Sequence, residues 1–209
     1  MKKAEIFIYS LYLIGIIFKL FRLPFHTIFI LITILTILAY YTYCLISKKK
    51  ELYITLTGMV TAVWLFYLLS ILKFFPFQGI VGIVTVCLSS ILFIVLVRNK
   101  RIITANSLFC AVIISITLFF KILPAHYTYY LFGIKFNYRI EKDYFALDKY
   151  SWFLYNADKQ TEAIEANRQA QKAVEVALKS SHQGDAEEYS ILIKKHEAEI
   201  LNKNWEKYP

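Results

Sequence analysis

Long apolar runs, each about the length of one membrane crossing, set the strongest limit on how this chain can fold. Five such runs fill most of its N-terminal part, over residues 4–21, 25–47, 53–72, 78–97 and 103–123. A helix needs roughly 20 apolar residues to cross a bilayer core about 30 Å thick. Because 58% of all residues are hydrophobic, the chain is predicted to be an all-α integral membrane protein with five transmembrane helices.

Three of these runs end in a short phrase that combines a basic residue, bulky apolar residues and proline. The phrases are FKLFRLP at 18–24, LKFFP at 72–76 and FFKILP at 119–124. Proline ends a helix because it lacks a backbone donor and clashes with the preceding turn, and a lysine side chain can extend to the lipid headgroups. The phrases therefore predict the tight turns of helical hairpins, repeated along the chain.

Basic residues are unequally shared between the two ends of the predicted helices. One end carries eight of them: Lys2, Lys3, Lys48, Lys49, Lys50, Arg98, Lys100 and Arg101. The hairpin turns carry four: Lys19, Arg22, Lys73 and Lys121. Because cytoplasmic loops are enriched in lysine and arginine, we expect a multi-pass protein of a bacterial inner membrane, with a cytoplasmic N-terminus and a periplasmic C-terminal part.

The composition changes sharply near residue 140. Residues 1–140 hold 14 Lys/Arg and two acids, a net charge of +12, whereas residues 141–209 hold 10 and 13, a net charge of −3. We predict a transmembrane domain over 1–124, an aromatic interfacial linker over 125–140 and a soluble three-helix domain over 141–209. The basic charges lie in short loops beside apolar runs, which argues against a nucleic-acid partner.

Alanine recurs along one face of the second helix predicted in the soluble domain. The spacings of three and four residues are those of a helical stripe, formed by Ala163, Ala166, Ala170, Ala173 and Ala177. Such small side chains allow another helix to approach closely. We expect this stripe and Trp152, in the preceding helix, to contact a partner protein or a second copy of the chain. The alternative is that both pack internally, against other helices of the same chain.

Two stretches resemble known families. Tyr150 to Leu178 resembles a single tetratricopeptide unit, through Trp152 and Leu154 in its first helix and the EAI triplet at 162–164 in its second. The resemblance implies a TPR-like helical hairpin that binds protein. The proline phrases are similar to turns in small hairpin membrane proteins of Bacteroidota, including gliding-motility motor subunits.

Little in the sequence indicates catalysis. Glu51 is the one acid between Glu5 and Glu141, and it lies in a loop, whereas ion-coupled pumps place carboxylates within their spans. No cysteine or histidine spacing fits a metal site, so neither a metal nor a cofactor is expected. Acids of the soluble domain are assigned to solvated helix faces: Asp143, Asp148, Glu162 and Glu165.

The sequence therefore favours a non-enzymatic membrane scaffold or accessory subunit that docks a partner through its C-terminal helices. The alternative is a protein that binds or transports lipid phosphates, using a cluster of basic residues and histidines at the hairpin turns: Lys19, Arg22, His26, Lys73, Lys121 and His126. Arginine can donate two hydrogen bonds to one phosphate. The same residues also suit simple anchoring of hairpin ends in the headgroups.

Overall fold

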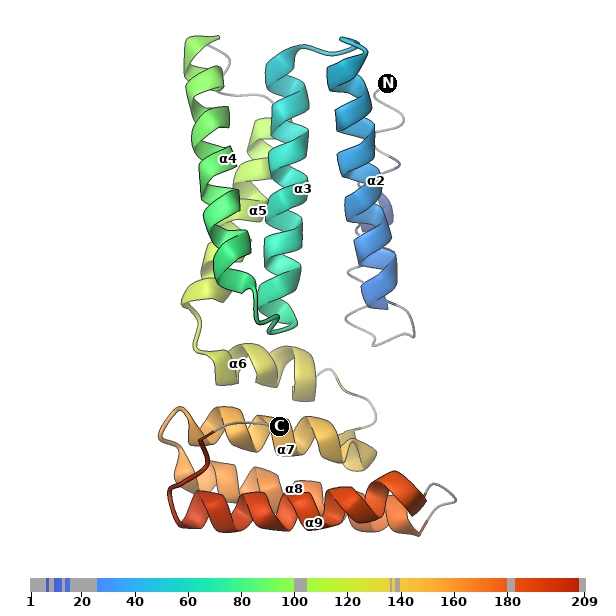
Figure 1. The fold of residues 1–209 in the computed structure, drawn as a ribbon, viewed down its shortest axis with the longest axis vertical. Helices are drawn as coiled ribbons and strands as arrows, with labels where there is room; N and C mark the ends of the chain where they lie inside the picture. Colours follow the sequence, from blue (N-terminus) through green and yellow to red (C-terminus); the bar gives the residue numbers. More distant parts are fainter. Residues whose placement is uncertain are drawn as a thin grey trace. The chain divides into compact units, whose positions relative to one another are not determined.

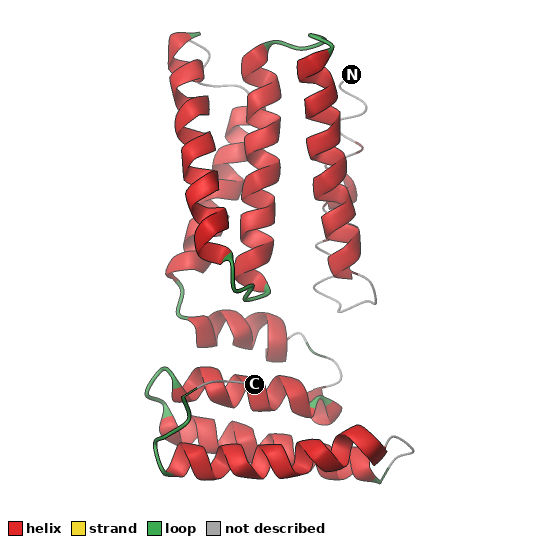
Figure 2. Cartoon of the chain, viewed as in Figure 1, coloured by secondary structure: helices red, strands yellow, loops and turns green. Residues whose placement is uncertain are grey.

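The computed structural model describes residues 26–99, 105–135, 137, 140–179 and 183–206, with residues 7, 10–12, 14 and 15 of the first apolar run. All regular structure within these residues is helical (Figure 2). The chain divides into two compact units, Met1–Leu123 and Pro124–Pro209. The prediction of an all-helical protein is confirmed for the described part of the chain.

Four helices of the first unit lie within the described residues over their full length (Figure 1): α2 (His26–Ile46), α3 (Leu52–Leu72), α4 (Gln78–Arg98) and α5 (Ala105–Ile122). Helix α3 is central and packs against the other three. Its side chains are mostly buried, whereas α4 buries only Thr85 and Leu92. Helix α4 therefore exposes most of its apolar side chains, as expected where the surroundings are lipid rather than water.

Three of these helices, α2, α3 and α4, are long and apolar enough to cross a membrane, and a fourth span results if α5 and the segment after it count as one broken span. These helices agree with the predicted membrane character and give three to four candidate spans among the described residues. The first of the five predicted spans, over 4–21, lies largely outside those residues.

The second unit contains α6 (Ala125–Tyr129), a π-helical turn η1 (Tyr130–Lys135), a 3-10 turn η2 (Ile140–Lys142), α7 (Tyr144–Tyr155), α8 (Gln160–Leu178) and α9 (Gln183–Leu201). Helix α8 packs against both α7 and α9. The segment predicted as a linker packs on α7, where the ring of Tyr129 lies 4.9 Å from that of Phe153.

Local sequence explains where the helices of the second unit begin and end. Asp143 precedes α7 and accepts a hydrogen bond from the backbone N–H of Ala146 at 3.0 Å, which satisfies one of the free donors of the first turn. Asp158, between α7 and α8, has a left-handed backbone with φ of 58°, a conformation that aspartate tolerates better than most residues. These residues fix the turns that bring the three long helices together.

Candidate functional site

The predicted alanine stripe lies inside the second unit. Four of its members are at most 5% exposed, and Ala177 packs at the edge of the same core. The alanines pack together with side chains of α7 and α9, among them Leu147, Ile193 and Ile200. Trp152 is partly buried beside Leu154. The small side chains therefore bring helices of this chain together, and most of the stripe is not available on the surface.

A buried polar network joins the same three helices. Asp148 of α7 is fully buried, and its carboxylate lies 2.9 and 3.0 Å from Nδ1 of His196 in α9. Asn167 of α8 donates from Nδ2 to that carboxylate at 3.2 Å and to the carbonyl of Ile193 at 3.1 Å. A carboxylate can only accept, so Nδ1 of His196 is the donor. Each of the three helices supplies one of these side chains.

The network continues to the surface through α8 and α9. Gln171 donates to Asn167 Oδ1 at 2.9 Å and to Glu197 Oε2 at 2.7 Å, and Arg168 donates to Glu197 Oε1 at 3.0 Å. The hydrogen bond from Gln171 lowers the pKa of Glu197, burial opposes this, and the bond from Arg168 lowers the pKa further. Glu197 therefore stays ionised and holds the outer end of the network in place.

This network fastens helices together and is closed to substrates. His196 is 2% exposed, and its ring stacks on that of Trp205 with 4.4 Å between centroids. The prediction that Asp148 lies on a solvated helix face is wrong, because the carboxylate finds two buried donors on other helices. The sequence alone did not predict that Asn167 and His196 contact Asp148. Each of the two nevertheless lies within the apolar stripe of its helix, and Asn167 lies between Ala163 and Ala170.

A groove that we call the docking groove opens on the surface of the second unit. It has a volume of about 290 Å³ and lies where η2, α7 and α8 meet. Its apolar lining is Ile140, Leu147, Ala173 and Val176, and its polar lining is Glu141, Gln169 and Lys172. Val176 is 47% exposed. Ala173 is thus the member of the alanine stripe that also lines this groove.

The predicted basic cluster is described only in part. Lys19 and Arg22 lie outside the described residues, as does the side chain of His26. His126 belongs to the second unit and is 7% exposed, with its ring 4.2 Å from that of Tyr127.

The remaining two members of that cluster lie at the same end of the first unit. Lys73 follows the end of α3, and Lys121 lies in the last turn of α5 (Figure 1). The loop with Lys48–Lys50 precedes α3, and Arg98 lies in the last turn of α4, so these residues are at the opposite end. The helix connections therefore separate the two sets of basic residues as the hairpin prediction requires.

Among the described residues there is no group of three or more histidine, cysteine or acidic side chains that could hold a metal ion. Cys44 and Cys110 are buried and Cys87 is exposed, all as free thiols. Comparison with protein families, with curated proteins and with solved structures finds no match for this chain.

Proposed function

We propose that this protein is a membrane-anchored, non-enzymatic scaffold that holds a partner protein on its C-terminal helical unit. The docking groove is the observation that supports this proposal best. Its apolar lining is bordered by charged and amide side chains, and protein interfaces combine a dry apolar centre with a polar rim in the same way. Energy at such interfaces is concentrated where a large side chain enters a pocket of this kind.

The groove favours one kind of partner. A branched aliphatic or aromatic side chain would cover Leu147, Ala173 and Val176, while Lys172 would donate to an acid or carbonyl next to it. The buried polar network keeps α7 and α8 in fixed register, so the two helices that form most of the groove present a rigid surface. A preformed groove binds more tightly because less ordering is needed on association.

The charge distribution supports a specific orientation. Lys48–Lys50 and Arg98 lie at the end of the first unit opposite Lys73 and Lys121. By the positive-inside rule, we propose that the N-terminus is cytoplasmic and that the second unit, which follows Lys121 in the chain, is periplasmic in a bacterial inner membrane. The tetratricopeptide resemblance of Tyr150 to Leu178 agrees with a protein-binding role for that unit.

The proposal is tested by affinity purification in mild detergent, followed by mass spectrometry. Full-length protein should carry a partner that is lost from a truncation after Leu123 and from the groove variant Val176→Glu. The matched control is Ile191→Glu, because Ile191 is 73% exposed on α9 and does not line the groove. Equal recovery of the partner with both glutamate variants would reject the groove, and a full-length protein that purifies alone would reject the scaffold role.

Lipid-phosphate binding at the hairpin turns is the second candidate. It is favoured by the common position of Lys73 and Lys121 at one end of the first unit, with Lys121 exposed. Charge reversal of both lysines should then remove anionic lipid that copurifies with the protein while leaving the protein partner bound. Loss of the partner with unchanged lipid would count against this candidate.

A further inference from the structure

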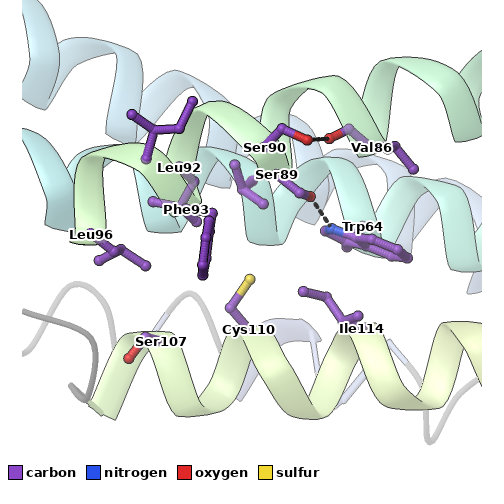
Figure 3. A pocket seen from close by; sticks show the side chains of 12 residues that line it. Trp64, Val86, Ser89, Ser90, Leu92, Phe93, Leu96, Ser107, Cys110 and Ile114 are labelled. Carbon is purple, nitrogen blue, oxygen red and sulfur yellow. Dashed lines mark hydrogen bonds between the residues drawn. The ribbon is translucent and has the colours of Figure 1, made fainter. Parts of the chain in front are cut away.

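A second groove, which we call the membrane groove, lies in the first unit between α3, α4 and α5. Its volume is about 510 Å³, within the range of small-molecule sites. Trp64 of α3, Ser89 and Phe93 of α4, and Cys110 and Ile114 of α5 border it (Figure 3). Because these positions belong to apolar helices, the groove lies at the depth of the lipid tails.

The polar atoms in its lining are used by the protein itself. Trp64 donates from Nε1 to Ser89 Oγ at 2.8 Å, and Ser89 in turn donates to the carbonyl of Thr85 at 2.8 Å. Ser90 donates to the carbonyl of Val86 at 3.0 Å (Figure 3). Because these polar atoms already have partners within the protein, an occupant of the groove does not need to form hydrogen bonds with them. Such a surface suits a hydrocarbon chain.

Lipid is a better occupant than another helix. The described part of the first apolar run lies against α2, since a Cβ on Gly15 would stand 2.9 Å from Ile30. Helices pair in membranes through small residues and hydrogen bonds, but Gly82 of α4 already faces α3, where its Cβ would stand 2.9 Å from Tyr67 Oη. The open side of the groove instead carries Phe93 and Ile94, each 65% exposed.

The groove lies toward the more basic end of the unit. It follows the C-terminal half of α4, the middle of α3 and the N-terminal half of α5. Lys49 and Lys50 at this end lie over tyrosine rings of α2, whereas Arg98 is in the last turn of α4, the helix that forms one wall. A phosphate there would meet a guanidinium suited to bind two of its oxygens.

We propose that the membrane groove binds one acyl chain of an anionic phospholipid, whose phosphate lies near Arg98. This inference is independent of the docking role of the second unit. It also differs from headgroup binding at the hairpin turns, because those lie at the opposite end of the helices.

Quenching of Trp64 fluorescence tests the proposal. Full-length protein is reconstituted in bilayers that contain phosphatidylglycerol or phosphatidylcholine with brominated acyl chains. The fluorescence of Trp64 is taken as the difference in tryptophan emission between the unchanged protein and Trp64→Phe. We expect stronger quenching by the anionic lipid. Ser90→Phe should fill the groove and reduce quenching, whereas Ile91→Phe, which adds the same ring at a neighbouring exposed position outside the lining, should not.

The headgroup is tested separately with Arg98→Gln. The preference for phosphatidylglycerol over phosphatidylcholine should fall about fivefold, the effect of one basic residue near an anionic surface, while Lys121→Gln at the other end should leave it unchanged. Equal quenching in Ser90→Phe and Ile91→Phe, or an unaltered preference in Arg98→Gln, would overturn the proposal. If Trp64 is protected from quenching and this protection disappears when the protein is diluted in lipid, a second copy of the chain occupies the groove. That result would also overturn the proposal.

Discussion

Replacing Asp148 with alanine removes the carboxylate that accepts hydrogen bonds from His196 at 2.9 Å and from Asn167 at 3.2 Å. Asn167 keeps its bond to the carbonyl of Ile193, but Nδ1 of His196 loses its acceptor inside the core. Because Asp148 is fully buried, water does not replace the lost partner without opening the helices.

The expected loss of stability is large. A hydrogen bond to a charged group contributes about 1.5–3 kcal/mol, and the Asp148 carboxylate accepts one from His196 and one from Asn167. We therefore expect the free energy of unfolding of the second unit to fall by about 3–5 kcal/mol, a large share of the 5–15 kcal/mol typical of a whole domain. The double variant Asp148→Ala/His196→Ala should lose less than the sum of the two single changes.

Hydrogen exchange of the full-length protein in detergent measures this effect at the backbone amides of α8. A loss of 3 kcal/mol or more corresponds to exchange that is roughly a hundredfold faster or more. Glu165→Ala is the matched control, since Glu165 is exposed on α8 and should change the free energy by about 0.5 kcal/mol or less. If Asp148→Ala exchanges no faster than this control, the network does not hold the helices together.

Two further predictions concern packing and pH. Gly58→Ala should lower the thermal midpoint of the first unit, because the added methyl group would overlap the buried ring of Tyr41. Overpacking of this kind costs about 1–3 kcal/mol. The control Gly79→Ala should not lower the midpoint, because there is open space around Gly79. The lowered pKa of Glu197 stabilises the folded state above the ordinary glutamate pKa of about 4.3, and this contribution is lost as the pH falls through the lowered value. The thermal midpoint of Glu197→Gln should therefore depend less on pH in this acidic range than that of the unchanged protein, and equal dependence would contradict the assignment.

Most of the helices could be predicted from the sequence alone. The run over 53–72 became α3 (Leu52–Leu72) and that over 78–97 became α4 (Gln78–Arg98), with ends within one residue of the prediction. The agreement has a local cause, since charged loops and proline phrases stop helices wherever they occur. Membrane helices are accordingly the part of this fold that depends least on distant contacts.

Burial of polar groups could not be predicted in the same way. Asp148, Asn167 and His196 are separated by 19 and 29 positions along the chain, and none of them alone shows which side chains it will contact. Burial of these side chains is favourable only when all three are in contact in the folded structure, because every buried donor and acceptor then has a partner. The docking groove was missed for a related reason: η2 and α8 must pack together before Ile140 and Val176 border one surface.

Trp152 and the alanine stripe illustrate a different limit of sequence patterns. Their helical spacing was correctly recognised, but spacing alone does not tell whether a stripe faces a partner or another helix of the same chain. Ala163 and Ala170 have no exposed surface, so their role in the described unit is internal packing.

The most direct test of the scaffold role is site-specific photo-crosslinking in cells, with a photoreactive amino acid in place of Val176. The account predicts a covalent adduct with another protein from this position and none from Ile191, an exposed position outside the docking groove. Identical adducts from both positions, or no protein adduct from position 176, would contradict it.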